Sequence, residues 1–281
     1  MKLENYKSLG EKEDIFKFVD YLKIDTVSEF NEWYDKYLSK NKVFRGVNEA
    51  KYKIYTSAQR EYIKRDLNKS GKSVDDIIAE ELKQVKLIDD GLLKKYFDLL
   101  GICDVDLLYL SFLQHYSGFS PLIDFTANLN KALFFMQDSC VFPKIGGEDI
   151  DNYMSLYSRE IEESHSHPNI DEPTLRERTS FSYIRRFKDA TIEIFSPKYK
   201  IGESMAMTMA NLNLVAQEGR FICYINDIKP LEENISCVDI HKSLTPYLKK
   251  ILKDQGIDKE SIYPQEEKIA QLALQKALEN I

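Results

Sequence analysis

The apolar positions of the chain change period several times, and each change predicts a different element. Near the N-terminus two groups of apolar residues recur at helical spacing. Thr26 and Glu29 have the spacing of a capping box ahead of the second group. We therefore expect two helices in the first forty residues, with apolar faces made by Ile15, Phe16, Val19 and Leu22 and by Phe30, Trp33, Tyr34, Tyr37 and Leu38.

Shorter runs of β-branched and aromatic residues predict strands, and longer periodic segments predict further helices. The strands are expected at residues 43–47, 190–195, 220–225 and 237–240, with an extended piece at 52–56. Helices are expected at residues 58–64, 77–85 and 105–116, after Thr126, and from Thr245 and Pro264 near the carboxyl end. Separated strands among long helices predict an α+β fold, in which a small mixed or antiparallel sheet is surrounded by many helices.

This pattern divides the chain into four parts. Residues 1–40 are expected to form N-terminal helices packed on the core, and residues 41–142 the first half of the main domain. Residues 143–188 are polar and irregular, so we predict an insertion or lobe there that is partly helical. Residues 189–281 complete the domain with strands and two closing helices.

Composition restricts the class of protein. The chain has 281 residues, of which 43% are hydrophobic, and a net charge of -7. Non-specific nucleic-acid binding depends on an excess of Lys and Arg, so nucleic acid is not an expected partner. The sequence starts without a signal-like apolar run and has no apolar stretch of about 18 residues, which argues against a membrane protein. Four dispersed cysteines without C-x-x-C spacing indicate reduced thiols in a cytoplasmic protein.

Polar residues embedded in apolar surroundings mark three candidate motifs. The first is Phe44-Arg45-Gly46, followed by Ser57 and Arg60. The second runs from Gln114-His115-Tyr116 through Asp124-Phe125-Thr126, and the third is Gln217-Glu218-Gly219-Arg220-Phe221. Buried polar groups need partners, so we predict that Arg45, Asp124 and Gln217 meet in the fold.

The order of these motifs resembles the FRG domain of bacterial proteins. A fourth segment, Gly256-Ile257 with Ser261-Ile262-Tyr263-Pro264, is also similar, and the resemblance extends from about residue 30 to residue 277. It implies an α+β domain. By association it implies an accessory or effector role in bacterial stress or anti-phage defence.

Arg45 has two interpretations. On a strand it shares the face of Val43 and Val47, so a guanidinium there must be paired or must bind an anion. An ion pair with Asp124 would make it a structural clamp, whereas a free guanidinium would bind a phosphate or pyrophosphate. Gly46 beside it leaves room for a close backbone or a ligand.

The same layout has a weaker resemblance to ADP-ribosyltransferases. That resemblance implies NAD as the cofactor, with Arg45 positioning it, Ser57 bracing the site, and Gln217 or Glu218 at the ribose. Neighbours on a strand face opposite sides, so only one of the last two can point into the site. A glutamine lacks the negative charge that stabilises an oxocarbenium ion.

The remaining candidates also have alternatives. His115 could act as a general base or bond a ribose hydroxyl, or be a core or helix-capping histidine. Asp124 and Thr126 could bind a ligand, or Asp124 could cap the following helix. His165 and His167 are expected to be solvated, and no metal site is predicted.

Two hypotheses follow. In the first, Arg45, Ser57, Arg60, His115, Asp124 and Gln217 form a pocket for a nucleotide-like anion such as NAD. In the second, the protein is a non-enzymatic binding module with an Arg45–Asp124 clamp, and a protein partner meets residues 143–188. A nuclease is disfavoured because no Asp, Glu and His cluster has metal spacing.

Overall fold

A six-stranded sheet forms the centre of the protein. A computed structural model describes residues 2–38, 41–99, 105–116, 118–142, 149–160, 177, 180–184, 200–201, 204–205, 212–226, 228–265 and 271. The strand order is β1-β8-β4-β2-β3-β7, with β1 parallel to β8 and the other neighbours antiparallel. The strands are β1 (Tyr21–Ile24), β2 (Lys42–Val47), β3 (Leu122–Thr126), β4 (Tyr153–Glu160), β7 (Gly219–Cys223) and β8 (Ser236–His241).

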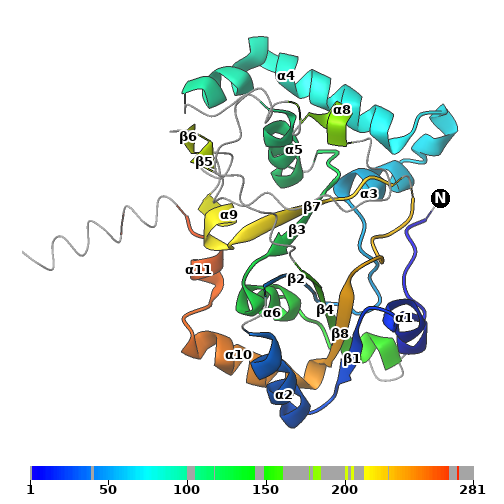
Figure 1. Ribbon diagram of the computed structural model, residues 1–281, viewed down its shortest axis with the longest axis vertical. Coiled ribbons are helices and arrows are strands. Elements are labelled where there is room, and N and C mark those ends of the chain that lie inside the picture. The colour runs from blue at the N-terminus through cyan, green and yellow to red at the C-terminus, as the bar shows by residue number, and fades with distance from the viewer. Residues whose placement is uncertain are drawn as a thin grey trace, which may run out of the picture.

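Helices cover this sheet in two groups (Figure 1). The upper group packs around the β3–β7 end, and its members are α3 (Ser57–Lys64), α4 (Val74–Leu99) and α5 (Asp106–His115). The lower group packs on the β2, β4 and β8 face, and its members are α2 (Val27–Tyr37), α6 (Leu129–Gln137) and α10 (Thr245–Asp254). Helix α1 (Leu9–Phe16) lies against the opposite face, where Phe16 joins a third apolar cluster.

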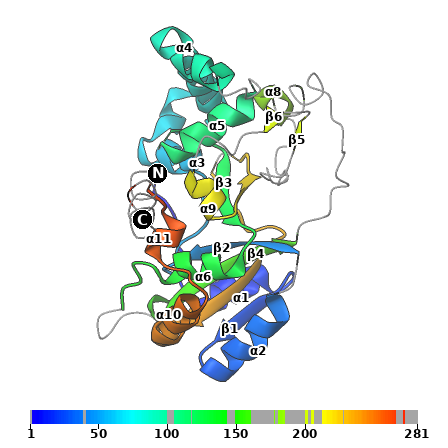
Figure 2. The same ribbon diagram turned by 90° about the vertical axis from the view of Figure 1, so that its left-hand side faces the viewer.

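Short elements complete the described chain. Helix α11 (Lys259–Ile262) lies beside α9 (Leu212–Ala216) near α6 (Figure 2). The others are α8 (Phe181–Ile184), the 3-10 turns at Leu67–Ser70, Asp149–Asn152 and Lys242–Leu244, and a two-stranded sheet of β5 (Lys200–Ile201) and β6 (Ser204–Met205). The α+β prediction is therefore confirmed.

Local signals in the sequence account for several helix ends. Thr26 and Glu29 form the predicted capping box, and each bonds the other's backbone N–H at the start of α2. Helix α10 has proline in its first turn and ends at Asp254, and Gly256 shortly after it has a φ of +68°, which is readily adopted only by glycine. Helix α4 is interrupted at residues 88–91, where three consecutive residues have positive φ.

Two predictions of secondary structure were wrong. The first predicted helix ends at Phe16, and residues 21–24 form the parallel edge strand β1, so Leu22 lies on a strand. Residues 153–160, placed in an irregular lobe, form strand β4 between β2 and β8. Residues 153–157 are buried, so this part of the segment belongs to the core. The predicted strand at 190–195 and most of the last predicted helix lie outside the described residues.

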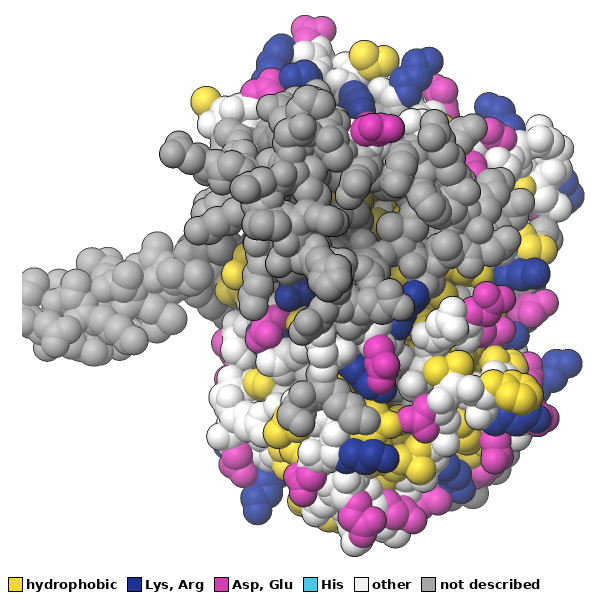
Figure 3. All heavy atoms as spheres, in the orientation of Figure 1, with side chains coloured by type: hydrophobic (Ala, Val, Ile, Leu, Met, Phe, Trp, Pro, Cys, Tyr) yellow, Lys and Arg dark blue, Asp and Glu magenta, His cyan; other side chains and the backbone are white. Residues whose placement is uncertain are grey.

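The surface of the described residues carries both signs of charge. On the face drawn in Figure 3, Lys and Arg side chains are interspersed with Asp and Glu. In the described part of the chain, no helix has the length and apolar character needed to cross a membrane.

Candidate functional site

The sheet separates between β2 and β3, and a pocket lies at the separation. Strand β2 pairs with β4 over six residues but with β3 only at Phe44 and Thr126. The pocket has a volume of about 600 Å³, within the range of small-molecule sites. Its described lining comprises Phe44, Arg45, Gly46, Val47, Asn48, Gln114, His115, Asp124, Phe125, Thr126, Phe135, Asp138, Ser139, Asn213, Gln217 and Tyr263. Arg45, Asp124 and Gln217 therefore meet in one pocket, as predicted.

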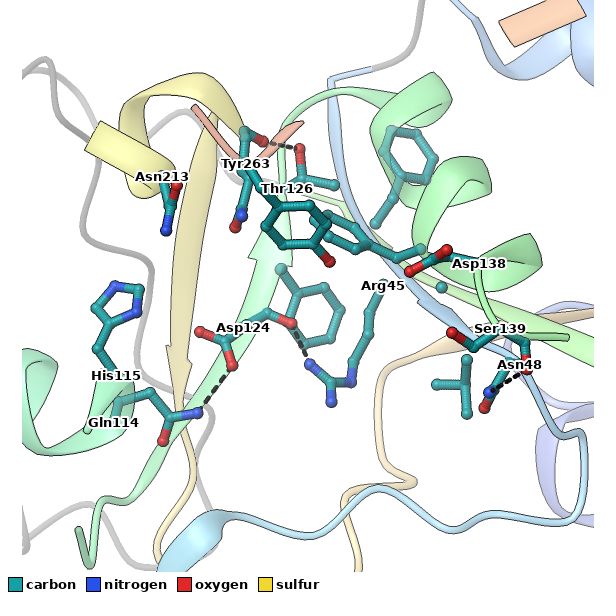
Figure 4. Close-up of a pocket in the computed structure, with 16 residues that line it drawn as sticks. Arg45, Asn48, Gln114, His115, Asp124, Thr126, Asp138, Ser139, Asn213 and Tyr263 are labelled. Atoms are coloured by element: carbon teal, nitrogen blue, oxygen red, sulfur yellow. Dashed lines mark hydrogen bonds between the residues drawn. The ribbon is translucent and has the colours of Figure 1, made fainter. Parts of the chain in front are cut away.

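Arg45 crosses the gap between the two strands (Figure 4). Its Nη1 donates a hydrogen bond of 2.6 Å to the backbone carbonyl of Asp124. Its Nε is buried and has no partner among the described residues. Burial lowers the pKa of Arg45. The negative charge of Asp124 acts to raise this pKa, and the positive charge of Arg60 lowers it further. The guanidinium is thus poorly solvated and incompletely bonded, a state that an anion would relieve.

Gly46 serves backbone packing. A Cβ at this position would lie 2.0 Å from the carbonyl oxygen of Ala132 and 2.6 Å from the amide nitrogen of Met136. Both atoms belong to α6, so the absence of a side chain allows this helix to contact β2 directly. Of the two uses predicted for Gly46, the structure shows the close approach of another backbone.

The carboxylate of Asp124 is not bonded to Arg45. It accepts a hydrogen bond of 2.8 Å from Nε2 of Gln114. The Oε1 of Gln114 in turn accepts a hydrogen bond of 3.1 Å from the hydroxyl of Ser57. Ser57 also accepts from the backbone N–H of Ser120, so it supports the site from behind. The predicted Arg45–Asp124 ion pair is therefore replaced by a contact to the backbone of Asp124.

Asp124 does not cap the helix that follows it. The cap of α6 is Asn128, whose side chain accepts from the backbone N–H groups of Asn130 and Lys131. This difference leaves the carboxylate of Asp124 exposed at the pocket, with its single bond to Gln114.

His115 is a neutral group at the pocket wall. Its Nε2 is buried without a hydrogen-bond partner in the described structure. Burial lowers the pKa of His115 below its usual 6.5, against a smaller opposing effect of Asp124. Its ring packs edge-on to Phe221 at 6.3 Å between centroids. The hydrogen-bonding capacity of this nitrogen is therefore unused in the described structure.

Thr126 and Gln217 hold the end of the pocket together. The Thr126 hydroxyl donates a hydrogen bond of 2.7 Å to the backbone carbonyl of Gln217 and accepts one from the backbone N–H of Asn128. Gln217 itself donates to the carbonyl of Ile262 at 3.2 Å. The Thr126 hydroxyl is thus used within the protein, although the residue lines the pocket.

Glu218 is turned away from the pocket. It lies in a turn ahead of β7, with a φ of +48°, and its carboxylate accepts bonds of 3.0 Å from Asn128 and 2.8 Å from Lys131. Burial acts to raise the pKa of Glu218, but these two bonds outweigh it and lower the pKa. Gln217 is therefore the inward residue of the pair. Arg60 also lies outside the lining, where its Nη1 donates to the carbonyl of Tyr55.

The comparisons with known proteins bear on the β2–α6 part of this site. Residues 40–140 match the family model of the FRG domain. The chain contains an FRG domain. The match covers the first two motifs, whereas the motif at Gln217 and the segment at 256–264 lie beyond it. No curated protein and no solved structure matches the chain.

The FRG domain supplies most of the pocket, and the carboxyl-terminal part completes it. Arg45, Gln114, His115, Asp124 and Asp138 lie within the matched residues. The carboxyl-terminal contribution to the wall is Asn213, Gln217 and Tyr263. The pocket lining therefore comes from both parts of the chain.

Several lining residues were not predicted as site residues. Gln114 begins the second candidate motif, and its position next to His115 is a signal that could have identified it. Phe135 and Asp138 lie at the end of α6 and Tyr263 after α11, where sequence pattern alone indicates packing or solvent. Two predicted features lie outside the described residues. They are the pair His165 and His167 and most of the predicted partner-binding region, of which only residues 149–160, 177 and 180–184 are described. Where the chain is described, no group of three or more His, Cys, Asp or Glu residues is arranged to hold a metal ion.

Proposed function

We propose that this FRG domain binds a nucleotide-like small molecule, with a phosphate group at Arg45. The buried, unpartnered Nε of Arg45 at the pocket wall carries this proposal. A guanidinium offers planar, charge-assisted donors that match phosphate oxygens. A phosphate beside the guanidinium would offset the desolvation of the cation.

His115 adds a second contact. A neutral imidazole with a free Nε2 can donate to or accept from a ribose or phosphate group, depending on its tautomer. The exposed carboxylate of Asp124, held by Gln114, can accept from ribose hydroxyls. NAD and ADP-ribose carry all of these groups.

We propose ligand binding and do not propose catalysis. ADP-ribosyl transfer needs a negative charge near the ribose, and the carboxylate of Glu218 is bonded to Lys131 and Asn128 instead. The family resemblance would place such a cytoplasmic nucleotide-binding protein among the accessory or effector parts of bacterial stress or anti-phage systems.

Calorimetric titration of ADP-ribose into wild type and Arg45→Met tests the proposal. We expect measurable binding to wild type, a loss of at least about tenfold in Arg45→Met, and partial recovery in Arg45→Lys. The matched control is Arg65→Met, because Arg65 is an exposed arginine on the chain just after α3 that pairs with Glu61. Binding that is equal in wild type and Arg45→Met would overturn the proposal.

Stability of the same variant separates this proposal from the structural clamp. Among the described residues the guanidinium of Arg45 has one hydrogen bond, to a backbone carbonyl, so its removal should lower the free energy of unfolding by less than about 1.5 kcal/mol. A loss of about 3–5 kcal/mol in Arg45→Met would favour the clamp and the non-enzymatic binding module.

A further inference from the structure

The charges of the pocket do not suit a ligand that is anionic throughout. Its described lining has one guanidinium, Arg45, and two carboxylates, Asp124 and Asp138, so the net charge is -1 with His115 neutral. A polyphosphate would be attracted at Arg45 and repelled elsewhere. The lining therefore favours a ligand that carries charge of both signs.

Asp138 marks the negative end of the pocket. Its carboxylate is partly buried and forms no hydrogen bond or ion pair with any described residue. It directly follows α6, where the last backbone carbonyls of the helix add negative potential. This carboxylate can therefore pair with a cation or accept a hydrogen bond from a ligand in the pocket.

Two aromatic rings accompany this carboxylate. The rings of Phe135 and Tyr263 lie 6.3 Å apart between centroids at an angle of 72°. Figure 4 shows the Tyr263 ring above the guanidinium of Arg45, with Asp138 to the right and with Gln114 and His115 at the far left. Burial raises the pKa of Tyr263 and the charge of Asp138 raises it further, consistent with the closeness of the two groups. Aromatic faces beside a carboxylate are a favourable setting for an organic cation.

We infer that Asp138, Phe135 and Tyr263 form a subsite for a positively charged, flat group, so that the ligand is a nucleotide with a cationic ring. This inference rests on the proposed function, because Arg45 must hold the phosphate while the ring reaches Asp138. It goes beyond the proposed function because it distinguishes between ligands that have the same phosphates but differ in the charge of one ring.

NAD⁺ and NADH are suitable probes, because they differ in the charge and planarity of one ring. We expect NAD⁺ to bind about fivefold to tenfold more tightly than NADH in calorimetric titrations of the wild-type protein. In Asp138→Asn the ratio should fall to about twofold or less, with binding of ADP-ribose unchanged. Tyr263→Leu should reduce the ratio in the same direction, which provides a second variant in case the first folds poorly.

The control is Asp254→Asn, because Asp254 is an exposed aspartate at the carboxyl end of α10. It should keep the wild-type ratio. Equal binding of NAD⁺ and NADH by wild type would overturn the cationic subsite while leaving the proposed phosphate site intact. Binding of neither dinucleotide, nor of ADP-ribose, would overturn both.

Discussion

The ammonium group of Lys12 lies 2.5 Å from a carboxylate oxygen of Asp239, and both side chains are fully excluded from solvent. Lys12 also donates to the hydroxyl of Ser155 at 2.6 Å and to the carbonyl of Ala50 at 3.0 Å. Asp239 accepts a further bond of 3.0 Å from the hydroxyl of Tyr21. This network joins α1 to three strands of the sheet, and it is the kind of buried ion pair that was predicted for Arg45 and Asp124.

Breaking this pair should destabilise the protein strongly. We expect Asp239→Asn and Lys12→Met each to lower the free energy of unfolding by about 3–5 kcal/mol, because each leaves its partner charged or unsatisfied in the core. Urea unfolding followed by circular dichroism measures the loss. Lys17→Met is the control, since Lys17 and Asp14 form an exposed pair and the change should be below about 1 kcal/mol. Equal losses in the two lysine variants would contradict the role assigned to Lys12.

Gly46→Ala should displace α6 from the sheet. The added methyl group would lie far inside contact distance of backbone atoms of Ala132 and Met136, which cannot rotate away. We expect a loss of at least about 3 kcal/mol in urea unfolding and weaker ADP-ribose binding, because α6 carries part of the pocket wall.

Gly10→Ala provides the matched comparison. Gly10 is in helix α1, and an added Cβ would be 3.8 Å from its nearest neighbour, Oγ of Ser8. Alanine should raise the stability by about 0.5 kcal/mol there, because it reduces the entropy of the unfolded chain. A Gly46→Ala protein as stable as wild type would show that α6 can shift without cost.

Acidification should weaken the fold through His115. Since burial lowers the pKa of His115 in the folded state, the unfolded chain binds the proton more readily. The contribution of His115 to the free energy of unfolding is therefore greatest above pH 6.5 and declines as the pH falls below that value. The slope should reach at most about 1.4 kcal/mol per pH unit. The measurement is urea unfolding of wild type and His115→Gln from pH 5 to pH 8 in a buffer without phosphate.

The difference between the two proteins isolates this one group. We expect wild type to lose stability relative to His115→Gln below pH 6.5. The opposite trend would mean that the folded protein favours the imidazolium, through Asp124, and that the neutral assignment is wrong.

Glu218→Gln should leave ligand binding unchanged. The carboxylate of Glu218 is bonded to Asn128 and Lys131 and does not line the pocket, so we expect ADP-ribose affinity within about twofold of wild type. The stability should change by about 1 kcal/mol or less, because the pair with Lys131 is partly exposed. Any nicotinamide release from NAD⁺ by the purified protein should survive this substitution. Release that Glu218→Gln abolishes would show that the carboxylate turns into the pocket during the reaction.

The strands that sequence predicted are short segments rich in apolar and β-branched residues. Residues 43–47, 220–225 and 237–240 have this composition, and they correspond to β2, β7 and β8. Strand β1 has only four residues and pairs in parallel with β8, more than 200 positions away, so local spacing favoured a helix. Residues 153–160 contain Ser155, Ser158 and Arg159 among apolar residues, and their burial depends on partners distant in the sequence.

The candidate site was predictable where a polar residue stands inside an apolar strand. Arg45 and Asp124 have this setting, and both line the pocket. Lys12 was not singled out, because Leu9-Gly10-Glu11-Lys12-Glu13 has the composition of a solvated helix face. Asp138 and Tyr263 could not be predicted, because their role depends on the separation of β2 from β3 and on where α6 ends.

The contact that Gly46 permits has a consequence for the choice of ligand. Arg45 is the residue before Gly46 on β2, and Asp138 follows the helix whose backbone rests on Gly46. The positive and negative groups of the pocket are thus carried by a strand and a helix whose backbones meet at Gly46. The backbone positions of Arg45 and Asp138 are therefore set by this packing contact before any ligand arrives. Molecules that carry both charges at a different spacing should therefore bind more weakly.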